Sequence, residues 1–195
     1  MTTEQMLHMS GIHLVPYIQA ATLLIGKSRE GGGNMFRHQL DTMAILIDYG
    51  FIDSVLLKAS LVHDLIEDIH GLDHNILLTI DSESKAVYDL VLEVSRREGE
   101  TKADFLTRIR KTGSYNAKIL KVADRISNMI SLGFVNNLDF VERYINETNE
   151  HVLPIAWDVS QYMTRELTDL LDSRRKYLER LRSQPVITNG DKKYL

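Results

Sequence analysis

A short run of the sequence, HDLIED at residues 63–68, places an imidazole and three carboxylates close together. On a helix, His63 lies above Glu67 and Asp64 above Asp68 as i,i+4 neighbours, opposite an apolar arc. The crowded carboxylates have no Lys or Arg at the same spacing, and such crowding costs stability unless a cation relieves it. A solvated polar face is the commoner explanation for one such helix. A bound divalent metal is the alternative that supplies the missing cation.

Two further segments carry single side chains of the same kinds. Asp124 lies at the edge of an apolar helical stripe, with Asn128 one turn further on. A partly desolvated carboxylate needs a partner, which is more often an arginine or a helix N-terminus than a metal. His38 falls in the first turn of another predicted helix, where a lone histidine is usually a surface or capping residue.

Taken together, the three segments supply two imidazoles and two carboxylates from three helices. A site built from His38, His63, Asp64 and Asp124 suits a borderline first-row divalent ion with open positions for water and substrate. Such an ion lowers the pKa of a bound water and polarises a phosphoryl oxygen, so the set indicates hydrolytic chemistry. This prediction depends on one spatial condition: all four side chains must meet at a common point.

The elements that would position these residues are helical. Apolar residues recur at three- and four-residue steps and only three prolines interrupt them, which favours a compact all-α domain over a β fold. Asp53 or Ser54 would cap the third helix, and Gly50 would end the second. The expected helices cover residues 11–26, 37–49, 53–69, 82–95, 101–111, 115–132, 138–153 and 158–183.

The composition limits the class of protein. The chain has 195 residues, 44% of them hydrophobic and 26% charged, which is typical of one folded globular domain. We expect this domain over residues 1–184 and a polar tail over 185–195. With no cysteine, thiolate metal sites and cysteine nucleophiles are excluded, and a net charge of −4 argues against binding nucleic-acid polymers. The sequence contains no recognisable membrane span or signal peptide, so we expect no membrane partner and a cytoplasmic location.

The sequence resembles the HD-domain metal-dependent phosphohydrolases. It is most similar to the hydrolase domain of the RelA/SpoT-type alarmone enzymes, including the stand-alone small alarmone hydrolases. The run HDLIED matches the HD-x-x-ED motif of that group, and VADRISNM at 122–129 matches its LADRLHNM motif. The segment 26–29, Gly-Lys-Ser-Arg, is similar to a glycine-glutamine-x-arginine segment of the group. The resemblance covers about residues 10–160 and implies an HD-type multi-helix bundle.

The resemblance implies a specific reaction. It makes His38, His63, Asp64 and Asp124 the metal ligands, with Mn²⁺ as the expected ion. Glu67 and Asp68 would orient or deprotonate the attacking water. The expected reaction removes the 3′-pyrophosphate from guanosine tetra- or pentaphosphate, leaving GDP or GTP, and we expect this chain to degrade these nucleotides without making them.

The same resemblance assigns residues to the nucleotide substrate. Arg29 would pack on the nucleobase, and Asn128 would contact the ribose or its phosphate. Lys27 and Arg125 are candidate cations for the phosphates, because an acidic protein needs local positive charge to attract a polyanion. The basic stretch 96–111, which includes Lys102, is more often a solvated helix face than a phosphate-contacting loop. The helix over 158–183 could bury its leucines in the core or against a second copy of the chain.

Four positions depart from the pattern of the group. Gln39 replaces a proline, Met35 a tyrosine, Ile69 a threonine and Ser127 a histidine. The expected ligands and the acidic pair are kept, so the departures alter only the pocket wall. Two alternatives therefore remain open. One is an HD-type nucleotidase or phosphatase acting on another nucleotide, such as NADPH, and the other is a non-catalytic nucleotide sensor.

Overall fold

The structure, a computed structural model, describes residues 2–30 and 33–183, and within these ranges the regular elements are helices. The all-α fold class is confirmed, since the one strand-like feature described is an isolated bridge between Ser28 and Asn34. The elements are α1 (Thr3–Ser10), α2 (Val15–Ala21), η1 (Thr22–Leu24), α3 (Met35–Asp48), α4 (Ser54–Val62), α5 (Leu65–Asp68), α6 (Asn75–Leu78), α7 (Ser84–Val94), α8 (Lys102–Thr112), α9 (Tyr115–Ser131), η2 (Leu132–Phe134), α10 (Leu138–Glu147), η3 (Thr148–Val152), α11 (Leu153–Val159) and α12 (Gln161–Ser183).

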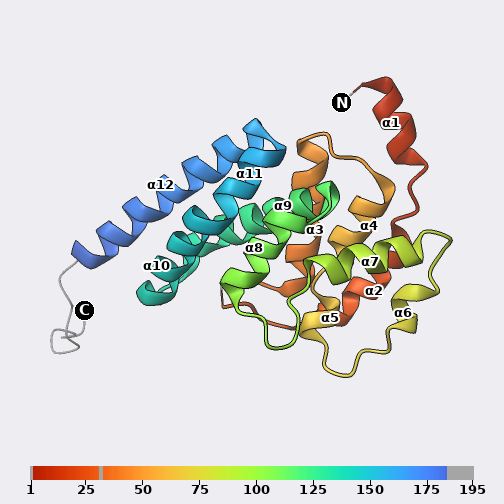
Figure 1. Cartoon of the computed structure of the whole chain (residues 1–195), viewed down its shortest axis with the longest axis horizontal. Helices are drawn as coiled ribbons and strands as arrows, with labels where there is room; N and C mark the ends of the chain where they lie inside the picture. The colour runs from red at the N-terminus through yellow and green to blue at the C-terminus, as the bar shows by residue number, and fades with distance from the viewer. Residues whose placement is uncertain (1, 31–32, 184–195) are drawn as a thin grey trace, which may run out of the picture.

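Helices α3 and α9 pack against each other at the centre of the bundle (Figure 1). Helix α4 covers one side together with α2 and α7, and α11 and α12 cover the other. Helix α9 buries an apolar stripe, and α12 buries Met163, Leu167, Leu171 and Leu178 within the chain. Of the two alternatives for this helix, packing within the chain is therefore observed, and association with a second copy stays a prediction. Because α3 and α9 are held from both sides, their polar residues at the shared surface have fixed positions.

The single helix expected over 53–69 is wrong, and the difference falls at the candidate site. Asp53 caps α4 as expected, accepting a hydrogen bond from the Leu56 N–H at 2.9 Å. The helix ends at Val62, and His63 and Asp64 form a turn before α5. The His63 Nδ1 lies 2.8 Å from the Ser60 carbonyl oxygen, which a continuing helix would use for the backbone of residue 64. The side chain of His63 therefore replaces a helical bond and turns into the bundle.

Other boundaries also differ from the expected ones. The helix over 11–26 begins only at Val15, with Pro16 in its first turn, and the short helices α1 and α6 fall outside every expected range. The helix over 138–153 passes into the π-helical segment η3, and Ser160, in an extended conformation, separates α11 from α12. Gly50 follows α3 with a φ of 77°, as a glycine after a helix C-terminus should. The expected tail over 185–195 lies outside the described residues, so the domain boundary stays a prediction.

Within residues 2–30 and 33–183, every helix is too short or too polar to cross a lipid bilayer. The cytoplasmic location stays a prediction.

A buried lysine anchors α4, the helix that leads into the candidate site. Lys58 is 4% exposed, and its Nζ lies 2.7 Å from Asp81 Oδ2 and 2.5 Å from Glu83 Oε2. Although burial opposes the charged carboxylate of Asp81, its hydrogen bond from Lys58 lowers its pKa, and the same lysine lowers the pKa of Glu83. The ion pairs therefore couple the packing of α4 to the loop before α7.

We expect Lys58→Met to lower the free energy of unfolding by about 2 kcal/mol at neutral pH, because it leaves two half-buried carboxylates unpaired. Both carboxylates have depressed pKa values in the folded state, so their stabilisation is present above their usual pKa near 4 and is lost as the pH falls below it. Urea unfolding at pH 6 and at pH 3.5 should show the difference between wild type and variant becoming smaller. A constant difference would contradict the ion-pair explanation. Lys85→Met, which breaks an exposed pair with Asp89, is the control and should change stability by less than about 0.5 kcal/mol.

Candidate metal centre and active site

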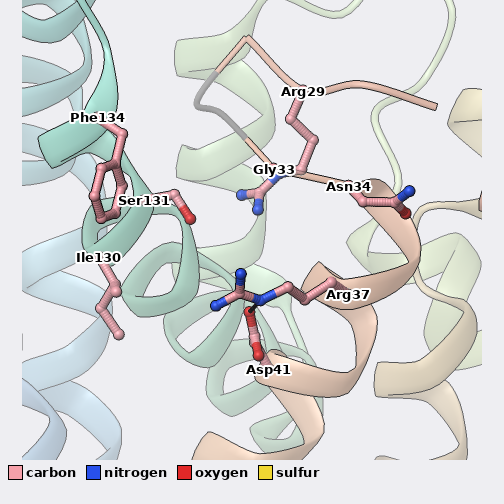
Figure 2. A pocket seen from close by; sticks show the side chains of 8 residues that line it. All are labelled: Arg29, Gly33, Asn34, Arg37, Asp41, Ile130, Ser131 and Phe134. Atoms are coloured by element: carbon pink, nitrogen blue, oxygen red, sulfur yellow. Dashed lines mark ion pairs between the residues drawn. The ribbon is translucent and has the colours of Figure 1, made fainter. Parts of the chain in front are cut away.

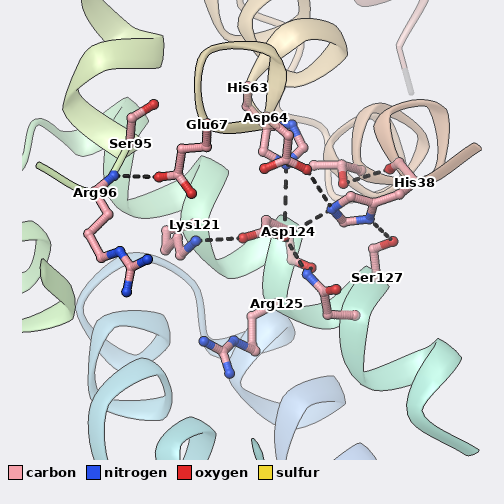
Figure 3. Close-up of polar contacts among 12 residues, drawn as sticks. His38, His63, Asp64, Glu67, Ser95, Arg96, Lys121, Asp124, Arg125 and Ser127 are labelled. Atoms are coloured by element: carbon pink, nitrogen blue, oxygen red, sulfur yellow. Dashed lines mark hydrogen bonds and ion pairs between the residues drawn. The ribbon is translucent and has the colours of Figure 1, made fainter. Parts of the chain in front are cut away.

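The four side chains expected to bind a metal meet at the junction of α3, α9 and the turn after α4 (Figure 3). One ligand atom each from His38, His63 and Asp124 lies within 4.8 Å of the others, and all three residues are buried. Asp64 joins this group, since its Oδ2 lies 3.5 Å from His38 Nε2 and 3.3 Å from His63 Nε2. Three of the four side chains therefore have the spacing of a metal site, and Asp64 lies beside both imidazoles. Their role as metal ligands stays a prediction.

Hydrogen bonds at the outer nitrogens orient both imidazoles. The Nδ1 of His38 lies 2.8 Å from the Ser127 hydroxyl oxygen, and the Nδ1 of His63 donates to the Ser60 carbonyl oxygen at 2.8 Å. The His63 Nε2 is buried and has no hydrogen-bond partner among the described residues. Such an orphaned ring nitrogen, aimed at two carboxylates, is the geometry expected of a metal-ligating histidine.

The two carboxylates are also held by neighbouring side chains. Asp64 Oδ2 accepts a hydrogen bond from Gln39 Nε2 at 2.9 Å, and Asp124 Oδ2 accepts one from Lys121 Nζ at 2.7 Å. The Asn128 amide donates to the other oxygen of Asp124. Gln39 and the Ser127 bonded to His38 are two of the positions where the sequence departs from the motifs of the group. The sequence showed that these residues are unusual, but not that each supports a candidate ligand.

The electrostatics of the site follow from burying acids beside imidazoles. Burial disfavours the charged form of His63, but the carboxylates of Asp64 and Asp124 outweigh it and raise its pKa to about 9. Burial likewise opposes ionisation of Asp124, yet Lys121 and the two histidines hold its pKa well below its usual value. The site thus keeps its carboxylates ionised. Two imidazole nitrogens and two carboxylates form a mixed donor set that could hold a divalent first-row metal.

The acidic pair lies beside this centre. Glu67 and Asp68 line the same cavity as His38, Asp64 and Asp124. This cavity, which we call the site cavity, has a volume of about 300 Å³ and is also lined by Ser28, Arg29, Glu30, Met35, Lys102, Lys121, Arg125, Asn128, Phe140 and Tyr144. Glu67 accepts a hydrogen bond from the backbone N–H of Arg96 (Figure 3), and Asp68 is paired with Lys27. Each acid is therefore positioned by a different segment of the chain.

The residues expected to bind substrate have three different surroundings. Arg29 and Asn128 line the site cavity, and the Arg29 guanidinium donates to the Asn128 side-chain oxygen. Arg125 also lines the cavity but is 1% exposed. Its guanidinium bonds to Thr148 and Glu147 and lies 4.2 Å from the ring centre of Tyr144. Lys27 contacts Asp68 and is not among the described residues that line the cavity.

Several residues that line cavities here were missing from the sequence prediction. Tyr144 reaches the site cavity from α10. Lys102 reaches it from α8, although the basic stretch that contains it was expected to be a solvated helix face. A second cavity of about 310 Å³ adjoins the first and shares Arg29 with it. Figure 2 shows Ile130 and Phe134 on one wall of this cavity, opposite Arg29 and the ion pair between Arg37 and Asp41. Phe134 is 82% exposed, and the available sequence signal was an aromatic residue six positions after Asn128.

Comparison with known proteins agrees with this description. No protein-family model matches the chain. The chain is 26% identical over 178 residues to a probable guanosine-3′,5′-bis(diphosphate) 3′-pyrophosphohydrolase of Mycoplasma genitalium, and 27% identical over 168 residues to a protein of the same name from Mycoplasma pneumoniae. These alignments cover 84% and 78% of this chain but only 24% and 22% of the two relatives.

A solved structure with a similar fold is described as a metazoan ortholog of SpoT that hydrolyses ppGpp and plays a role in starvation responses. It matches with a TM-score of 0.71 and 19% identity, over 83% of this chain and 94% of that one. The expected helical bundle shares the fold of that structure, and the expected resemblance to the ppGpp hydrolase group is confirmed as a similarity.

Proposed function

We propose that this chain hydrolyses guanosine tetra- and pentaphosphate, releasing pyrophosphate from the ribose 3′-oxygen and leaving GDP or GTP. The observation that carries the proposal is a cluster of two histidines and two aspartates beside a cavity that a separate acidic pair and basic side chains line. The names of the two Mycoplasma relatives support this choice of substrate.

We assign His38, His63, Asp64 and Asp124 as ligands of a divalent metal, with Mn²⁺ as the proposed ion. When bound, such a metal lowers the pKa of water and polarises a phosphoryl oxygen. The buried His63 Nε2, which has no hydrogen-bond partner among the described residues, is the clearest support from this chain. The bond from its Nδ1 to the Ser60 carbonyl fixes the ring, so that Nε2 is the nitrogen that binds a metal once its proton is released.

Glu67 and Asp68 are the residues proposed to manage the proton. Water attacks the phosphorus that is bonded to the ribose 3′-oxygen, and that P–O bond breaks. The acidic pair orients the water and accepts its proton. Return of this proton to the departing 3′-oxygen gives the ribose hydroxyl and restores the pair. Both carboxylates line the site cavity, so both are within the space where the phosphate would lie.

The remaining residues are proposed to hold the nucleotide. Arg29 stands between the two cavities, and the second one offers the apolar side chains of Ile130 and Phe134, which suit the flat face of a nucleobase. Asn128 lies beside Arg29 and is proposed to contact the ribose or its phosphate. Arg125 contributes fixed positive charge to the wall, since Glu147 and Tyr144 prevent its side chain from moving freely.

Identification of the leaving group tests the proposal. Purified protein with Mn²⁺ should release pyrophosphate from guanosine tetraphosphate, and the other product should be GDP by chromatography. Release of orthophosphate, or turnover only of another nucleotide such as NADPH, would instead support a nucleotidase of the same fold. Binding of guanosine tetraphosphate by calorimetry, with no product after prolonged incubation, would support a sensor and contradict hydrolysis.

A further inference from the structure

Lys27 reaches from the loop after η1 to the end of α5. Its Nζ lies 3.0 Å from Asp68 Oδ1 and also donates to the backbone carbonyl oxygen of Asp68. The two side chains are 37% and 30% exposed, so the pair is partly shielded from water. One ammonium group therefore holds both the carboxylate and the main chain of the same acid.

The position of this ammonium matters because α5 is short. The helix ends at Asp68, and Ile69 is already extended, so the last carbonyl groups have no helical partner. A cation that bonds these carbonyls stabilises the end of a helix. Gly26, directly before Lys27, has a φ of 82°, and this left-handed turn sets the direction in which the lysine leaves the loop.

The other acid of the pair is held separately. Glu67 accepts a hydrogen bond from the backbone N–H of Arg96. Arg96 follows α7 in the sequence, whereas Lys27 precedes α3. The donor of this hydrogen bond is a main-chain N–H, so the bond does not depend on the side chain of Arg96. Substituting Lys27 should therefore release Asp68 and leave Glu67 in place.

We propose that Lys27 is a positioning residue for the reaction: it acts through Asp68, by fixing that carboxylate at the site cavity, rather than by contacting the nucleotide. The expected effect of Lys27 on kcat rests on the proposed function. It differs from the sequence-based assignment of Lys27 to the substrate, because both contacts of the ammonium are to Asp68 and the described residues lining the cavity do not include it.

A double-mutant cycle tests this proposal at saturating Mn²⁺. We expect Lys27→Met to lower kcat about 10-fold with KM changed less than about twofold, since losing a residue that orients a functional group typically costs 10–100-fold. Lys27→Arg should recover most of the activity. In the Asp68→Asn background, Lys27→Met should add less than about twofold, because its effect passes through the missing carboxylate. Multiplicative losses, or a rise in KM at constant kcat, would overturn the proposal.

Hydrogen–deuterium exchange supplies a readout that does not need turnover. The amides of Asp68 and Ile69 bond to the carbonyls of Asp64 and Leu65 at 2.9 and 3.0 Å. Their exchange should be faster in Lys27→Met than in wild type, Lys27→Arg or the control Lys85→Met. Equal exchange in all four proteins would overturn the proposal. If the wild type cleaves no nucleotide, the proposed function fails while the exchange result still decides whether Lys27 holds this helix end.

Discussion

Asp124→Asn is expected to lower hydrolysis of guanosine tetraphosphate by at least about 10³-fold and to weaken Mn²⁺ binding by more than about 10-fold. The substitution keeps the shape of the side chain but removes a negative charge that lies 3.1 Å from His38 Nε2 and 2.7 Å from Lys121 Nζ. A neutral carboxamide is a weaker metal ligand. It also leaves the partly buried Lys121 ammonium without its carboxylate partner, which adds to the repulsion that a metal cation would meet.

Titration calorimetry with Mn²⁺ and a pyrophosphate-release assay measure the two parts of this prediction. Asp89→Asn is the matched control, because Asp89 lies on the exposed face of α7 in a pair with Lys85 and should affect neither quantity. Circular dichroism should show both variants folded. Unchanged Mn²⁺ affinity in Asp124→Asn would mean that the metal centre is not at these residues.

Glu67→Gln is expected to separate binding from chemistry. The glutamine keeps an oxygen that can accept the Arg96 backbone hydrogen bond, but it cannot take a proton from water. We expect kcat to fall by about 10²–10⁴-fold, which is the usual contribution of a general base. Mn²⁺ affinity and KM should stay within about twofold of wild type, because Glu67 is not one of the four residues assigned to the metal.

Steady-state kinetics with pyrophosphate detection, together with calorimetry, would show this separation. Glu98→Gln is the control, since Glu98 is exposed and lines a neighbouring cavity together with Glu67. A variant that loses Mn²⁺ binding along with activity would place Glu67 among the ligands. A variant with wild-type kcat would leave Asp68 as the one acid of the pair that acts on water.

Both predictions use residues that the sequence identifies, and the reason is chemical. Imidazoles and carboxylates that recur on predicted helices beside apolar stripes form an unusual pattern, and helical periodicity shows which side of each helix is apolar. The all-α class follows from the same periodicity, because a spacing of three and four residues puts apolar side chains on one face of a helix. Capping residues such as Asp53 act on their own helix, so their roles are also visible in the sequence.

The tertiary structure alone decided how these residues meet. The break after Val62 depends on the His63 side chain bonding to the Ser60 carbonyl, a competition with the backbone that periodicity does not detect. The contact of Ser127 with His38 joins two helices, and that of Gln39 with Asp64 joins a helix to a turn. The contact of Lys27 with Asp68 joins a loop to the end of a helix. Such pairings arise when α3 and α9 pack together and α5 settles against the loop before α3. The sequence therefore determined which groups are available for chemistry, while packing determined which of them touch, because contact between distant segments is fixed only once the core has formed.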